Sequence, residues 1–172
     1  MRLDSFNALT YDEAMKDLLR CCGARRWATQ MAARRPFHTL EEVLTTADQL
    51  WSACDRTDMV EAFRHHPKIG DVASLRTRFA TTKQWAEGEQ AGVRAAADEV
   101  LKKLAAGNEA YEQKFGYIFI VCATGKTADE MLALLEERLL NQPALELRIA
   151  ASEQAQIIRI RLAKLLQEES RK

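Results

Sequence analysis

The stretch PALELRIAASEQAQIIRIRLAKL, residues 143–165, predicts a long amphipathic helix. Pro143 stands at its start, where proline is favoured because that first amide has no partner within the helix. At about 100° per residue, an apolar stripe runs along one face. Gln154 and Arg161 lie inside this stripe, and Arg159 projects from the opposite side. The apolar members of the stripe are Leu147, Ala150, Ala151, Ile157, Ile158, Leu162 and Leu165.

The position of Arg161 is the most informative feature of this helix. Burying an unpaired guanidinium costs several kcal/mol, so the side chain requires an acidic partner, a path to solvent or an anionic ligand. The sequence leaves a structural ion pair and a ligand contact both open.

Helical signals continue through the rest of the chain. Capping boxes at Thr10, Thr39 and Thr127, each with Glu three residues later, predict three helix N-termini. The predicted helices cover about residues 11–21, 25–34, 40–54, 57–64, 83–107, 109–115 and 128–140, with the last opening at Pro143. We therefore expect an all-α, single-domain bundle of about eight helices, with no sheet, over residues 1–172.

One run departs from this pattern. Residues 117–122, Tyr-Ile-Phe-Ile-Val-Cys, are aromatic and β-branched almost throughout. No second run of this kind exists to pair with it, so it cannot form a sheet. We interpret it as a buried extended or loosely helical segment whose backbone groups find partners in side chains or a ligand. It is therefore a candidate wall of a binding site.

Composition restricts the class of protein. A chain of 172 residues with 47% hydrophobic residues can bury one sizeable core. Its 25 basic and 25 acidic residues cancel, which argues against nucleic acid or an anionic membrane as a partner and favours a small ligand. No apolar leader, membrane-length run or Ser-Lys-Leu ending is visible, so we expect a soluble, cytoplasmic protein. Its four cysteines are interpreted as reduced core residues.

The stretch FRHHPKIGD, residues 63–71, combines chemistry with a sharp change of backbone direction. Pro67 pushes His66 out of the helical region, so its imidazole is expected on an extended corner after a helix. Gly70 then permits a tight return. The alternative is a helix-ending turn with a solvated histidine pair.

Short motifs follow one another along nearly the whole chain. They are Cys21-Cys22-Gly23 with Trp27, Arg35-Pro36-Phe37, His66 to Gly70, Glu89 to Gly92, Asn108 to Tyr111, Lys114 to Val121, Arg138 to Asn141, and Ile157 to Leu162. Taken together, in this order and at this spacing, they resemble the 2-oxo-4-hydroxy-4-carboxy-5-ureidoimidazoline (OHCU) decarboxylases of urate breakdown.

This resemblance implies a helical homodimer that converts OHCU to (S)-allantoin without a metal or organic cofactor. It places the catalytic residues at His66, Glu89 and Arg161. Lys68 stands where relatives often have Arg, and Ala86 where many have Ser. The implied substrate-binding residues are Pro67, Ala86, Glu87, Gly88, Gln90, Ile118, Phe119, Ile120, Val121 and Cys122.

Two other classes of function fit parts of the sequence. A helical interaction module would use the apolar stripes and exposed tryptophans and would need no chemistry from His66. A metal-dependent hydrolase would use His38, His65 and His66, but adjacent histidines point in different directions and no acidic ligand lies at helical spacing. Metal analysis of the purified protein distinguishes the second of these.

Overall fold

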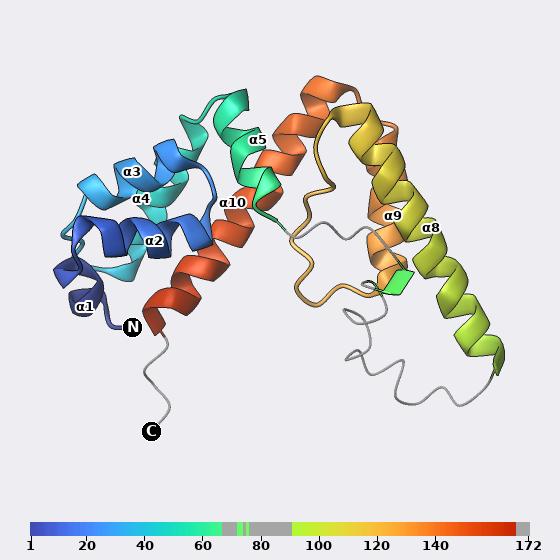
Figure 1. The fold of residues 1–172 in the computed structure, drawn as a ribbon, viewed down its shortest axis with the longest axis horizontal. Coiled ribbons are helices and arrows are strands. Elements are labelled where there is room, and N and C mark those ends of the chain that lie inside the picture. The colour runs from blue at the N-terminus through green and yellow to red at the C-terminus, as the bar shows by residue number, and fades with distance from the viewer. Residues whose placement is uncertain (67–71, 74, 76–90, 168–172) are drawn as a thin grey trace. The chain divides into compact units, whose positions relative to one another are not determined.

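A computed structural model describes the chain except residues 67–71, 74, 76–90 and 168–172. The described part contains helices and no strand, which confirms the predicted all-α class. It divides into two compact units, residues 1–66 with 151–172, and residues 67–150 (Figure 1). No helix among the described residues is long and apolar enough to cross a membrane.

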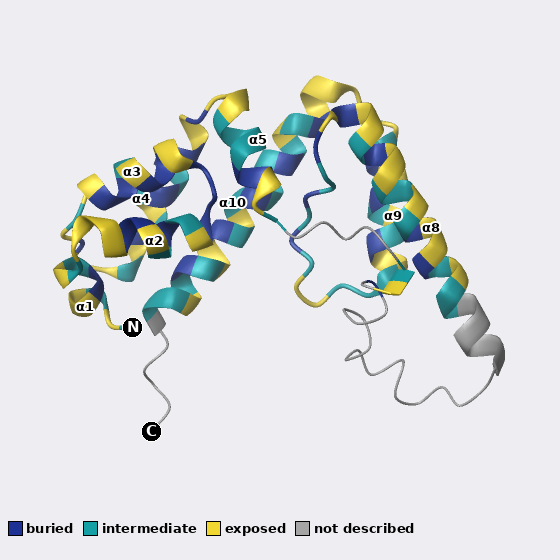
Figure 2. Cartoon of the chain, viewed as in Figure 1, coloured by how far each residue is buried: buried dark blue, intermediate teal, exposed yellow. Residues whose placement is uncertain are grey.

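The first unit is built around α3. This helix contacts α2, α4 and α5, and the fully buried Trp27 and Met31 lie on it. The C-terminal part of α10 completes the unit, and its buried residues form an interrupted dark stripe in Figure 2. The helices are α1 (Leu3–Ala8), α2 (Tyr11–Cys21), α3 (Arg25–Ala33), α4 (Leu40–Ser52), α5 (Arg56–Arg64) and α10 (Pro143–Gln167).

The predicted capping boxes form at two of their three positions. At Thr10 and Thr127 the side chain accepts from the amide of the later Glu, whose carboxylate accepts from the Thr amide in return. Thr39 makes only the first of these bonds. The Glu42 carboxylate instead accepts from the amide of His38 at 2.7 Å, so it satisfies the residue before the cap.

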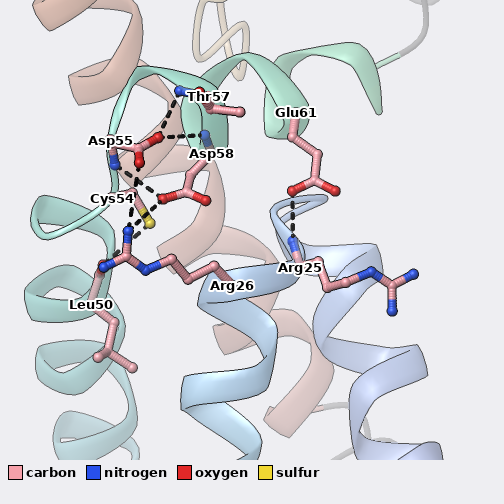
Figure 3. A network of polar contacts seen from close by, with 8 residues as sticks. All are labelled: Arg25, Arg26, Leu50, Cys54, Asp55, Thr57, Asp58 and Glu61. Atoms are coloured by element: carbon pink, nitrogen blue, oxygen red, sulfur yellow. Dashed lines mark hydrogen bonds and ion pairs between the residues drawn. The ribbon is translucent and has the colours of Figure 1, made fainter.

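An unpredicted capping box begins α5, where Asp55 and Asp58 cap each other's amides. Arg26 of α3 lies 3.2 Å from the Asp58 carboxylate and 3.7 Å from that of Asp55 (Figure 3). The Glu61 carboxylate accepts from the amide of Arg25 at 3.1 Å. These contacts attach α5 to the start of α3, and α5 leads directly to His66.

The second unit contains α8 (Ala91–Phe115), which packs on α9 (Ala128–Leu139), and the start of α10. The predicted break at Gly107 is wrong, because α8 continues through it. A Cβ at this position would lie 2.7 Å from Cδ2 of Leu135, a fully buried residue of α9. Gly107 therefore permits close packing of two helices and does not end one.

All four cysteines are buried and free, in agreement with their interpretation as reduced core residues. Burial raises the pKa of Cys21 to about 11, that of Cys22 to about 12 and that of Cys54 to about 11. These three thiols are therefore protonated at neutral pH, which makes them poor nucleophiles.

Candidate active site

His66 lies just beyond α5, where its amide still donates to the carbonyl of Phe63 at 3.1 Å. Its imidazole Nε2 lies 2.6 Å from Oε1 of Gln154 on α10. Gln154 is fully buried and belongs to the stripe predicted from sequence. A contact across 88 positions of the chain therefore fixes where the His66 ring lies in the first unit.

The His65 side chain makes different contacts from that of His66. Its Nδ1 lies 2.9 Å from the carbonyl of Glu61, one turn back in α5. Its ring packs against Gly23, where an added Cβ would come within 2.3 to 2.5 Å of the His65 Cγ, Nδ1 and Cβ. The Cys-Cys-Gly motif therefore ends in glycine because no other residue leaves room for His65.

We expect Gly23→Ala to lower the free energy of unfolding by roughly 1–3 kcal/mol, the usual cost of overpacking. Rotating the His65 ring does not remove the clash, because the Cβ of His65 is itself too close. Urea denaturation measures the loss. Adding His65→Gly should restore most of the stability, and an unchanged midpoint for Gly23→Ala alone would contradict the close contact.

Arg161 follows Gln154 by seven residues, close to two helical turns, so both lie on the same face of α10 at an axial spacing of about 10 Å. Its Nη1 donates to the carbonyls of Arg20 at 3.4 Å and Cys21 at 3.2 Å, at the C-terminal end of α2. Helix C-termini carry partial negative charge and attract cations. Among the described residues no carboxylate pairs with Arg161, so the structural ion pair considered from sequence is not found there. Its Nε and Nη2 can meet an anion.

The predicted wall, residues 118–122, lies in the second unit and belongs to neither a helix nor a strand. Side chains partner its backbone: Arg138 Nη1 donates to the carbonyl of Ile120 at 2.8 Å, and Lys126 Nζ to that of Cys122 at 2.7 Å. Ile120 and Cys122 are buried, whereas Ile118, Phe119 and Val121 are half-buried. Side-chain donors thus satisfy two of the backbone carbonyls of this segment. Its contact with substrate stays a prediction.

A buried charge network that sequence reasoning missed supports this segment. Arg138 donates to Glu146 Oε1 through Nε at 2.8 Å and Nη2 at 2.6 Å. Asn141 donates to Glu146 Oε2 at 2.8 Å, and the Tyr111 hydroxyl donates to Oε1. Burial, and then this hydrogen bond, raise the pKa of Tyr111. One signal was available, because Glu146 precedes Ala150 by four residues and so continues the apolar stripe.

The other site residues predicted from the resemblance fall outside the described part of the chain. They are the catalytic Glu89 and the substrate-binding Pro67, Ala86, Glu87, Gly88 and Gln90, together with Lys68. The structure brings His66 and Arg161 to one face of α10. It also shows that Gln154 contacts His66. The sequence had placed Gln154 on the stripe without assigning it a role.

Two of the three tryptophans considered for an interaction module lie among the described residues. Trp27 and Trp51 are buried, and their indole nitrogens donate to the carbonyls of Ala47 at 3.1 Å and Ala151 at 2.8 Å. They are not the exposed tryptophans of an interaction module, and Trp85 lies outside the described residues. In the described part of the chain, no three His, Cys, Asp or Glu side chains are grouped to hold a metal.

The fold and these side chains define an all-helical protein in which the His66 imidazole contacts α10 through Gln154 and the Arg161 guanidinium projects from the same helix. The chain belongs to the OHCU decarboxylase family, whose model matches residues 7–163. A solved OHCU decarboxylase, crystallised in the presence of (S)-allantoin, is 38% identical with a TM-score of 0.70, covering 88% of this chain and 98% of that one. An (S)-allantoin synthase, 15% identical with a TM-score of 0.69 and covering 95% of this chain and 53% of that one, shares the fold.

Curated relatives agree with this assignment. The uric acid degradation bifunctional protein TTL of Arabidopsis thaliana is 36% identical over 151 residues, which cover 88% of this chain and 47% of that protein. The OHCU decarboxylase of Amia calva is 25% identical over 170 residues, covering 97% of this chain and 95% of that one. The chain thus spans about half of the Arabidopsis protein and nearly all of the Amia protein.

Proposed function

We propose that this chain decarboxylates OHCU to (S)-allantoin in urate breakdown. The observation that carries the proposal is the placement of His66 and Arg161 along one face of α10, in a chain that matches the OHCU decarboxylase family over residues 7–163. The named activity of the relatives supports the same substrate, and the 38%-identical decarboxylase crystallised with (S)-allantoin present supports the same product.

The substrate itself supplies the chemistry that a cofactor would otherwise provide. One ring carbon carries both a carboxylate and a hydroxyl, next to a carbon–nitrogen double bond. When carbon dioxide leaves, the electron pair of the broken bond forms a carbon–carbon double bond, and the displaced π pair moves to nitrogen, which takes a proton. The hydroxyl then loses its proton while the neighbouring carbon gains one. The protein must supply orientation and proton transfer, and we propose no metal or organic cofactor.

In this scheme His66 is the general acid and base. Histidine suits both directions of proton transfer near neutral pH, since its usual pKa is about 6.5. Glu89 orients or shares the proton. Arg161 holds the anionic or carbonyl end of the substrate through Nε and Nη2, and amides of residues 118–122 hold the ring and ureido group.

The experiment is circular dichroism of allantoin formation, with OHCU generated in place from urate by the two preceding enzymes. Spontaneous decay gives racemic allantoin, so an optical signal reports the enzyme. We expect a rapid rise of the (S)-allantoin signal with the wild-type protein. A slow, racemic decay in its presence would overturn the proposed activity.

Arg161→Lys should raise KM by roughly 10- to 100-fold, the equivalent of one charge-assisted hydrogen bond lost from substrate. Lysine keeps the positive charge but lacks the planar guanidinium, whose several N–H groups can bind an anion while Nη1 donates to the end of α2. Initial rates over a range of OHCU concentrations give KM, and urea denaturation gives stability. Unchanged kinetics together with lower stability would mean that Arg161 serves only to attach α10 to α2.

We further propose that the protein acts in the cytoplasm as a homodimer, as the resemblance implies. Light scattering coupled to size-exclusion chromatography measures the mass in solution. A mass near 39 kDa, about twice the 19.5 kDa of one chain, is expected, and a monomer over the assayed concentrations would refute the dimer.

A further inference from the structure

The contact between His66 and Gln154 indicates which nitrogen of the His66 ring carries a proton. The atom of Gln154 that faces His66 Nε2 is the amide oxygen Oε1, at 2.6 Å. A carboxamide oxygen accepts hydrogen bonds and cannot donate them. His66 Nε2 must therefore carry a proton whenever this contact is made.

That requirement fixes the protonation pattern of the ring. A neutral imidazole has one N–H, so a proton on Nε2 leaves the lone pair on Nδ1. When Nδ1 takes up a proton, Nε2 keeps its own, and the bond to Gln154 persists through the transfer. The same acceptor thus serves both charge states of His66 without any rearrangement.

Gln154 is well placed to hold the ring. It is fully buried in the middle of α10, and its Nε2 has no hydrogen-bond partner among the described residues. Within that part of the chain the Gln154 amide is therefore bonded only through His66.

The neighbouring His65 has the opposite arrangement. Its Nδ1 faces the backbone carbonyl of Glu61 at 2.9 Å, and a backbone carbonyl likewise only accepts. Neutral His65 therefore carries its proton on Nδ1. Two consecutive histidines hold opposite tautomers, one set by a backbone carbonyl and the other by Gln154.

We propose that Gln154 is a positioning residue for His66, which holds the Nε2–H tautomer and so makes Nδ1 the nitrogen that exchanges protons with substrate. The second part of this inference rests on the proposed function, whereas the tautomer itself does not. A ring of the other tautomer, or one free to rotate, would present its lone pair in the wrong direction.

The test is nitrogen-15 NMR of the labelled full-length protein, above the pH at which its histidines titrate. The chain has only three histidines, which simplifies assignment. In the wild type we expect a protonated, pyrrole-type Nε2 in His66 and a protonated Nδ1 in His65. A pyridine-type Nε2 in His66 would overturn the tautomer assignment with no variant required.

Gln154→Met tests the source of this preference, since methionine has similar length but no comparable acceptor. We expect His66 to become a tautomer mixture while His65 is unchanged. We expect kcat for OHCU to fall by roughly 10- to 100-fold with KM within about twofold, because proton transfer is affected and substrate binding is not. Gln156→Met, at an exposed position of the same helix, is the matched control and should change neither.

The outcomes separate the two levels of the inference. If Gln154→Met leaves the His66 spectrum unchanged, Gln154 does not set the tautomer. If the spectrum changes but kcat does not, the positioning role is wrong. If the wild-type protein does not turn over OHCU, the proposed function and the positioning role both fall, and the spectra alone decide the tautomer.

Discussion

His66→Ala is expected to lower kcat for stereospecific allantoin formation by about 10²- to 10⁴-fold, the usual contribution of one general acid–base residue. The helical content should be retained, because the His66 side chain is half-buried beyond the end of α5 and is not part of a helix. Circular dichroism provides both measurements, with far-ultraviolet spectra for the fold and the (S)-allantoin signal for the rate.

His65→Ala is the matched control for this loss. The residue is adjacent and also an imidazole, but its contacts are with Glu61 and Gly23 and not with Gln154. We expect its kcat to stay within a few-fold of the wild type. Equal losses in the two variants would assign the effect to the chain corner rather than to His66, and full activity of His66→Ala would remove it from the mechanism.

The same substitution has a second, thermodynamic consequence. Without His66, the Gln154 carboxamide has no partner among the described residues, and an unsatisfied buried polar group costs roughly 1–3 kcal/mol. Adding Gln154→Met should recover much of this stability without recovering activity. The recovery separates the structural role of the pair from its catalytic role.

Features that depend on a few neighbouring residues could be predicted from the sequence. The capping boxes at Thr10 and Thr127 form as expected because their hydrogen bonds join positions three residues apart. The predicted helix break at Gly107 was wrong because tertiary packing, and not a helix end, requires glycine at this position. Glycine there serves the approach of Leu135 from another helix, and local sequence contains no information about that neighbour.

The candidate site shows the same division. Pro67 indicated a corner at His66, and helical periodicity placed Gln154 and Arg161 on one face. The pattern could not give the partner of each. Gln154 meets His66, and among the described residues the Arg161 guanidinium meets backbone carbonyls of α2. Several of the family motifs, including Tyr111, Arg138 and Asn141, prove to be members of a buried network around Glu146.

That network leads to the largest stability effect we expect. Arg138→Met should lower the free energy of unfolding by about 3–5 kcal/mol, because it leaves the Glu146 carboxylate buried without its cation. Arg138 is 5% exposed and Glu146 0%. The change also removes the donor to the carbonyl of Ile120, so the predicted substrate wall loses support. Urea denaturation of the full chain measures the cost.

The chain offers a matched ion pair for comparison. Arg159 and Asp48 also pair, but their side chains are 47% and 41% exposed, and surface pairs contribute about 0–1 kcal/mol. Arg159→Met should therefore cost far less than Arg138→Met, although each removes one guanidinium. Glu146→Leu combined with Arg138→Met should cost less than the sum of the single changes, since no uncompensated charge is left in the core. Equal losses for Arg138 and Arg159, or strict additivity in the double variant, would show that burial of charge is not what makes this network important.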